Sequence, residues 1–176
     1  MNSSKNTQCL RNDRPTDRRK GKESQSLKIH KLYDAKLSEI EKSKSLILGK
    51  GVTTNYQLDA SAESILPPGK FKGTFSSDKL PTLKSSHSCI LNLDNSSEPG
   101  SHWVAIYRSG NRLCCYDSFG RHAKQILPDT KIRKGLKIVD SDLDAEQSIE
   151  EKNCGQRCLA WLCMVYDHGV TQAMKI

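Results

Sequence analysis

The chain has 176 residues, which suits one compact domain with a tail. It carries 28 Lys and Arg against 20 Asp and Glu, and residues 1–50 hold 13 of the basic but only 6 of the acidic side chains. The longest strongly apolar stretch, 158–166, is far shorter than the roughly 20 residues that span a bilayer, and the N-terminus lacks the apolar segment of a secretory signal. We therefore expect no membrane association, and seven cysteines that are free thiols rather than a disulfide framework.

The front of the chain has the composition of a disordered tail. Residues 1–26 are rich in Ser, Asn, Lys, Arg and Gln, so we assign the folded domain to 27–176. A basic cluster in this tail favours nucleic-acid binding or nuclear import, and a purely solubilising tail is the alternative. The cluster consists of Arg14, Arg18, Arg19, Lys20 and Lys22.

Apolar periodicity predicts the elements of the domain. A helix is expected over 28–44, because apolar residues recur there every three or four positions, at Ile29, Tyr33, Leu37 and Ile40. Several Pro and Gly residues lie within 51–87, which we expect to be rich in loops. Short apolar runs then predict four strands, and a segment that is apolar nearly all round predicts a buried helix, so the sequence favours an α+β fold. The strands are expected at 89–93, 103–107, 113–116 and 136–139, and the helix at 154–166.

The hairpin formed by the second and third of these strands places a histidine near a carboxylate. A turn at 109–110 pairs His102 with Asp117, whereas a turn at 110–111 puts His102 opposite Phe119 and moves the carboxylate by two positions. Directly opposed Cβ atoms lie about 4.5–5.5 Å apart. In either register a carboxylate can hold one imidazole nitrogen and leave the other free as a base.

The cysteine that opens the predicted buried helix is the candidate nucleophile. The positive end of the helix dipole stabilises a thiolate at Cys154, and the thiolate is the reactive form. Gly155 allows close approach of a substrate, and a first-turn N–H without an intrahelical acceptor can bind an oxyanion. Gln147, in a polar loop seven residues earlier, is the candidate for a second oxyanion donor.

Each of these residues alone also has a structural interpretation. A histidine beside a tryptophan is usually structural, an aspartate that ends a strand is usually a turn residue, and a glutamine in a loop carries no signal. The other cysteines of the predicted strands and helix are expected to be small core residues. The functional hypothesis depends on the combination and its order along the chain: His102, Asp117, Gln147, Cys154.

This ordered set, with its neighbours, resembles the adenovirus-type cysteine proteases, which share a clan with the SUMO-deconjugating peptidases. The resemblance spans about residues 65–166. It includes a small residue-His-Trp motif, an acid-x-Phe-Gly motif, a Gln seven residues before Cys-Gly, a Cys-Gly-x-x-Cys helix start and an early Phe-x-Gly-x-Phe segment. In this chain these are residues 101–103, 117–120, Gln147, 154–158 and 71–75.

The resemblance implies a central mixed sheet with a buried helix that carries the nucleophile at its N-terminus. It implies that His102, Asp117, Gln147 and Cys154 are catalytic, and Trp103 and Gly155 are expected to line the substrate groove. The implied enzyme is a cysteine endopeptidase that uses no metal or organic cofactor, although DNA or a viral peptide stimulates such enzymes. We expect a monomer, encoded by a small DNA virus or virus-like transposon, that processes capsid or core precursor polypeptides in the host nucleus or the virion.

Two other functions stay open at the level of the sequence. Adenoviral enzymes carry Glu as the third member of the triad, and Asp117 is the choice of the deconjugating branch, so a SUMO- or ubiquitin-like deconjugase is the first alternative. The second alternative is a catalytically inactive, basic structural protein that binds nucleic acid through residues 1–50.

Overall fold

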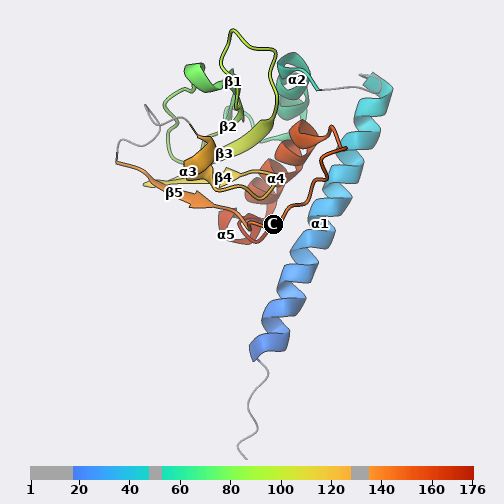
Figure 1. Cartoon of the computed structure of the whole chain (residues 1–176). Coiled ribbons are helices and arrows are strands. Elements are labelled where there is room, and N and C mark those ends of the chain that lie inside the picture. Colours follow the sequence, from blue (N-terminus) through green and yellow to red (C-terminus); the bar gives the residue numbers. More distant parts are fainter. Residues whose placement is uncertain (1–17, 48–52, 128–134) are drawn as a thin grey trace, which may run out of the picture.

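The structure is a computed structural model that describes residues 18–47, 53–127 and 135–176. It has the α+β architecture that the sequence predicts, with five strands in one mixed sheet. Helix α4 lies against one face of the sheet, and the long helix α1 packs on the outer side of α4 (Figure 1). The helix predicted to be buried is therefore enclosed between the sheet and α1, which accounts for its apolar character on nearly every side.

The sheet follows the chain in simple order, β1-β2-β3-β4-β5. The outer pairs β1–β2 and β4–β5 are parallel, and the inner pairs β2–β3 and β3–β4 are antiparallel. The strands are β1 (Phe71–Ser76), β2 (Ser88–Asn92), β3 (Trp103–Ser109), β4 (Arg112–Tyr116) and β5 (Lys137–Asp140). The helices are α1 (Arg18–Ile47), α2 (Asn55–Ile65), the short 3₁₀ helix η1 (Ser77–Lys79), α3 (Ala123–Ile126), α4 (Cys154–His168) and α5 (Val170–Ala173).

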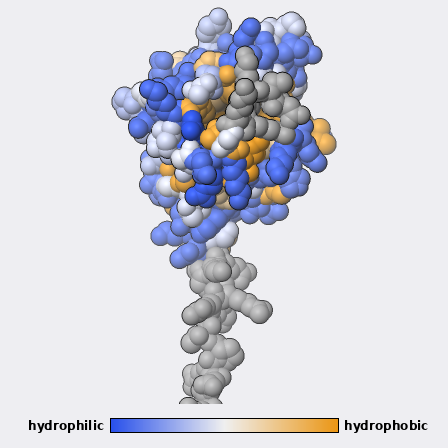
Figure 2. All heavy atoms as spheres, turned by 90° about the vertical axis from the view of Figure 1, so that its left-hand side faces the viewer, coloured by the Kyte–Doolittle hydropathy of each residue, from blue (hydrophilic) through white to orange (hydrophobic). Residues whose placement is uncertain are grey.

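Both faces of the central strands are buried, so these strands are continuous apolar runs rather than alternating ones. One face packs under α4, and the other forms a second apolar cluster with α3 and the segment before β2. The first face includes Ile90, Ala105, Cys114 and Tyr116, and the second includes Cys89, Leu91, Val104, Ile106, Leu113 and Cys115. The second cluster is less completely covered, and apolar surface is visible on the side of the domain that bears β5 and α3 (Figure 2).

The predicted N-terminal helix is confirmed, but it is longer than expected. Its apolar residues Ile29, Tyr33, Leu37 and Ile40 are all buried against the domain. The helix begins at Arg18, however, so 18–26 are helical instead of disordered, and these first turns project beyond the body of the domain (Figure 1). In the basic cluster, Arg14 lies outside the described residues, as do the side chains of Arg18, Arg19, Lys20 and Lys22.

The segment 51–87, which we expect to be rich in loops, also contains α2, β1 and η1. Helix α2 buries only Leu58 and Ala62, too few apolar residues to produce a helical period. Its start does carry a sequence signal, a capping box between Thr54 and Gln57. Strand β1 is interrupted by Gly73, which has φ of +116° and lies where the register with β2 shifts.

Candidate active site

The β3–β4 hairpin decides between the two registers that the sequence allows. Ser109 pairs with Arg112, so the turn is formed by residues 110–111. His102 therefore falls opposite Phe119, and their rings stack with centroids 4.6 Å apart and an interplanar angle of 29°. Phe119 thus fixes the plane of the imidazole just beyond the end of the strand pair.

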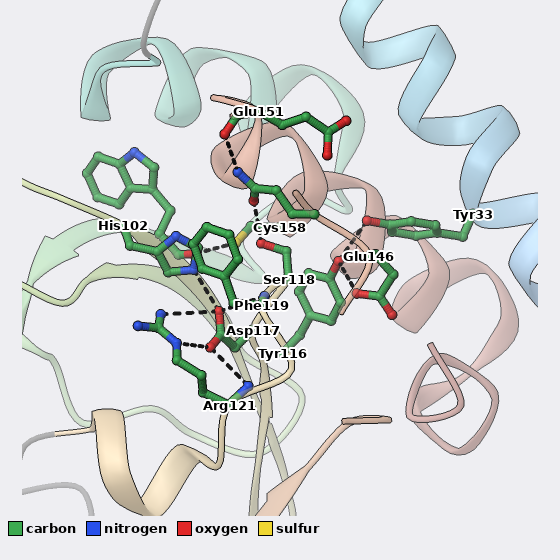
Figure 3. Close-up of polar contacts among 12 residues, drawn as sticks. Tyr33, His102, Tyr116, Asp117, Ser118, Phe119, Arg121, Glu146, Glu151 and Cys158 are labelled. Atoms are coloured by element: carbon green, nitrogen blue, oxygen red, sulfur yellow. Dashed lines mark hydrogen bonds and ion pairs between the residues drawn. The ribbon is translucent and has the colours of Figure 1, made fainter. Parts of the chain in front are cut away.

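The same hairpin brings His102 and Asp117 into direct contact (Figure 3). The Nε2 atom of His102 lies 2.7 Å from Oδ1 of Asp117, and the two residues are only 5% and 4% exposed. The remaining ring nitrogen is Nδ1, and the His102 side chain lies near enough to the Cys154 thiol for each group to shift the pKa of the other. The imidazole therefore connects a buried carboxylate to a cysteine, as the sequence predicts.

Arg121 is a further partner of this carboxylate, and sequence reasoning missed it. Its Nε donates to Oδ2 of Asp117 at 2.7 Å, its backbone N–H lies 3.3 Å from the same oxygen, and its guanidinium carbon lies 5.4 Å from the centre of the Phe119 ring. The only available signal was its position four residues after Asp117, across a turn that returns the chain to the carboxylate. Figure 3 shows His102, Phe119 and Arg121 grouped around Asp117.

These contacts set the protonation states of the pair. Burial opposes ionisation of Asp117, but the hydrogen bonds from His102 and Arg121 outweigh it and lower the pKa of the carboxyl to about 2. Burial also disfavours the imidazolium of His102, yet the bonds to Asp117 and Cys154 raise its pKa above the ordinary value. The arrangement therefore favours a charged carboxylate beside a readily protonated imidazole.

Cys154 is the first residue of α4, and its pKa is shifted in the opposite direction to that of four other cysteines. Burial opposes its ionisation, but the His102 hydrogen bond and the backbone N–H groups of Trp103 and Gly155 outweigh it and lower the pKa of the thiol. Burial raises the pKa of four other cysteines in the described part of the chain, Cys89, Cys114, Cys115 and Cys163. Cys154 thus has the environment of a reactive thiol.

Gly155 has a packing role in addition to the substrate contact that the sequence predicts. It is buried, and a Cβ atom at this position would lie 2.9 Å from a δ-carbon of Leu58 in α2 and 3.4 Å from Cβ of Thr53. The missing side chain therefore permits α2 to pack against the start of α4. Contact between the Gly155 backbone and a substrate stays a prediction.

Gln147 is buried and lies against the segment that follows Asp117, not directly against Cys154. Its backbone N–H donates to the Ser118 carbonyl at 3.0 Å, and its side-chain oxygen accepts from the Ser118 hydroxyl at 2.6 Å. Its amide nitrogen donates to the Glu151 carbonyl at 2.6 Å, which uses one of the two amide hydrogens. The second hydrogen has no hydrogen bond among the contacts of the described residues. The role as oxyanion donor stays a prediction.

A cleft of about 560 Å³ opens beside the thiol. Cys154 and Trp103 line it, together with the loop 94–101 and the end of β1. The Trp103 indole N–H donates to the Thr53 carbonyl at 3.2 Å, which holds the ring in the cleft wall. The expectation that Trp103 lines a groove next to the nucleophile therefore agrees with the geometry.

The loop that leads to His102 is held by a buried asparagine at the end of β2. The Asn92 side-chain oxygen accepts from the backbone N–H groups of Asp94 and Ser101, at 2.9 and 3.4 Å. Gly100, with φ of +89°, leaves room for this amide, because a Cβ there would lie 2.7 Å from the Asn92 nitrogen. The Asn92 side chain thus helps to hold the two ends of the loop together next to His102.

No family model matches the chain, and no curated protein matches it. Within residues 18–47, 53–127 and 135–176, no group of three or more His, Cys, Asp or Glu side chains is placed to hold a metal ion. In the same residues no helix combines the length and apolarity that crossing a membrane requires.

Proposed function

We propose that the chain is a cysteine peptidase with Cys154 as nucleophile and His102 as general base. The observation that carries this proposal is the buried imidazole that binds the Asp117 carboxylate through Nε2 and lowers the pKa of the nearby Cys154 thiol. The thiol lies at the start of a helix and lines an open cleft, so it meets the electrostatic and steric needs of nucleophilic attack.

The geometry supports the following reaction. His102 takes the Cys154 proton, and the thiolate sulfur forms a bond to the scissile carbonyl carbon while the carbonyl oxygen becomes an oxyanion. Backbone N–H groups at the start of α4 and the Gln147 amide stabilise that oxyanion. The protonated His102 then donates its proton to the leaving amine as the C–N bond breaks, and water hydrolyses the thioester. Asp117 orients the imidazole and stabilises its protonated form.

For the biological substrate, we propose viral or transposon-encoded capsid or core precursor polypeptides, cleaved in the host nucleus or the virion. The support is the resemblance to adenovirus-type proteases, which extends beyond the reacting residues to the Trp103 and Phe119 positions. That family favours small, glycine-containing cleavage sites. In this proposal, DNA binds the basic N-terminal segment and stimulates the enzyme.

The test combines an active-site probe with two substrates. We expect a limiting amount of iodoacetamide to alkylate Cys154 first, and Cys154→Ala to abolish cleavage of a Gly-Gly peptide while the protein stays folded. Cys163→Ala, inside the same helix, is the control and should retain activity. Labelling of another cysteine first, together with activity in Cys154→Ala, would contradict the assignment.

A SUMO- or ubiquitin-fluorophore conjugate, assayed beside the Gly-Gly peptide, separates endopeptidase from deconjugase. The deconjugase is kept as second candidate because the third member of the triad is Asp117 rather than Glu. Faster turnover of the conjugate than of the peptide would favour that candidate.

A further inference from the structure

Three residues that directly precede site residues are joined in one polar network. Tyr116 precedes Asp117, Glu146 precedes Gln147, and Asn153 precedes Cys154 in the chain. All three make side-chain contacts that lead to helix α1 or to Arg157 of α4. Because each is covalently next to a site residue, any contact that fixes it also fixes the backbone from which the site side chain projects.

The first arm of the network runs from α1 to the Gln147 loop. The Tyr33 and Tyr116 hydroxyls lie 2.7 Å apart, and the Tyr116 hydroxyl donates to Glu146 Oε2 at 3.1 Å (Figure 3). Since Tyr116 gives its only hydrogen to Glu146, Tyr33 is the donor to Tyr116. Tyr33 is 1% exposed and Tyr116 is fully buried, so water does not compete for these bonds.

The second arm runs from α1 to the residue before the nucleophile. Asn153 Nδ2 donates to Oε1 of Glu41 at 2.9 Å, and Arg157 Nε donates to Oδ1 of the same amide at 3.0 Å. The Arg157 guanidinium also lies near enough to the Tyr33 hydroxyl to favour ionisation of the phenol, so Arg157 links the two arms electrostatically. Tyr33 and Glu41 are eight residues apart on α1, about 12 Å along the helix axis, and therefore hold two separate points of the site.

We propose that α1 is an intramolecular positioning element for the peptidase site, in which Tyr33 holds the Asp117 and Gln147 segments and Glu41 holds the start of α4. This inference rests on the proposed function. Neither residue touches the reacting atoms, so both are positioning residues. Displacement of α1 by a binding partner would then change turnover, because it releases the segments that carry Asp117, Gln147 and Cys154.

Glu146 makes this network sensitive to pH. The groups that face it are Tyr116 from β4, Tyr33 from α1, Arg157 from α4 and Asp142 from its own loop. Its Oε1 atom is buried and has no hydrogen bond in the described structure. Burial raises the pKa of Glu146 to about 7, so at higher pH the loop that carries Gln147 acquires a poorly compensated buried charge.

The experiment measures kcat, KM and melting temperature for conservative variants of the full chain. Tyr33→Phe and Glu41→Ala are expected to lower kcat about three- to ten-fold, the worth of one hydrogen bond, with little change in KM. Glu41→Gln keeps the acceptor for Asn153 and should restore most of the rate. The ratio of kcat in Glu146→Gln to kcat in wild type should rise several-fold between pH 6 and pH 8, since the variant cannot ionise.

Two matched controls isolate positioning from stability. Tyr166→Phe removes a comparable hydroxyl away from the site, one that donates to Ser88 Oγ at a distance of 2.9 Å. Glu39→Ala removes an α1 carboxylate whose partner is Lys36 of the same helix. If Tyr33→Phe and Glu41→Ala match these controls in kcat, or lower only the melting temperature, the proposal is wrong. A ratio for Glu146→Gln that does not vary with pH would contradict its pH-sensitive part.

Alkylation of Cys154 by iodoacetamide gives a readout that does not need a substrate. Tyr33→Phe and Glu41→Ala should change its rate constant several-fold relative to the two controls. If the wild-type protein cleaves no peptide but this difference is present, the proposed function fails while the positioning role stands. If the protein cleaves peptide and no such difference in alkylation or kcat exists, only the positioning role fails.

Discussion

Arg121 and His102 bind opposite oxygens of the Asp117 carboxylate, each at 2.7 Å. The carboxylate is thus held by two cationic or potentially cationic partners rather than by the imidazole alone. Arg121 also lies over Phe119, which itself stacks on His102. The guanidinium therefore contacts both residues that position the His102 ring: Asp117, which binds its edge, and Phe119, which stacks on its face.

Removal of this guanidinium should shift acid stability toward higher pH. The depressed pKa of Asp117 means that its pairing stabilises the fold above about pH 4 and that this contribution is lost as pH falls toward 2. In Arg121→Ala the carboxyl should titrate at higher pH, so the midpoint of acid unfolding should rise. Circular dichroism between pH 1.5 and 6 measures this, with Arg112→Ala as the exposed control. An unchanged midpoint would mean that His102 and the backbone N–H groups of Phe119 and Arg121 keep the carboxyl pKa low without the guanidinium.

His102 and Asp117 should contribute unequally to the catalytic rate. His102→Ala removes the group that transfers the proton and should lower kcat about 10²- to 10⁴-fold. Asp117→Asn leaves that group in place and should cost less, because the aspartate only orients and stabilises the imidazole. Single-turnover rates on a Gly-Gly peptide compare them. Full activity in Asp117→Asn would show that Phe119 and the loop before His102 orient the ring without a carboxylate.

Gly155→Ala should reduce stability because its methyl group would press on Leu58, which is fully buried. We expect the free energy of unfolding to fall by about 1–3 kcal/mol, as in other overpacked cores. Leu58→Val provides space beside the new methyl group, so the double variant should recover part of that loss in urea titrations. Loss of activity without loss of stability would instead support substrate contact at Gly155.

The basic cluster should bind DNA weakly and without sequence preference. Such binding releases counterions, so log Kd should depend linearly on log salt, with a slope of about 0.7–0.9 per phosphate contacted. Replacement of Arg14, Arg18, Arg19, Lys20 and Lys22 by Gln should flatten this slope for a fluorescent oligonucleotide. Lys28→Gln with Lys31→Gln, at exposed positions farther along α1, is the control. An equal slope for cluster and control variants would place DNA binding elsewhere on the domain.

The parts of the molecule that sequence analysis predicted are those governed by local pattern. The stripe on α1, the central strands and the apolar helix α4 follow from residue spacing alone. His102 and Asp117 could be paired because a hairpin keeps a constant register, and the two possible turns left them close in either case. Helix α2 was not predicted, because its two buried residues, Leu58 and Ala62, are too few to show the apolar period of a helix.

Contacts between distant segments could not be predicted in this way. The Tyr33–Tyr116 bond joins residues 83 positions apart, and it depends on how α1 crosses α4 and the sheet. Arg121 is close to Asp117 in the chain, but its pairing depends on the turn that Gly120 makes with φ of +67°, where a Cβ would clash with the Leu143 carbonyl oxygen. One sequence specifies such contacts only through the complete tertiary structure.

The packing of α1 against α4 has a consequence for synthesis of the chain. Glu41 and its partner Asn153 are 112 residues apart, so the ribosome releases α1 long before the helix that covers its apolar stripe. Through most of translation Ile29, Tyr33, Leu37 and Ile40 lack their final partners, and the thiol of Cys154 is among the last site groups to be added. Under the proposed function, the site is assembled only after α4 has emerged and α1 has docked, so peptide cleavage would begin after this domain has folded.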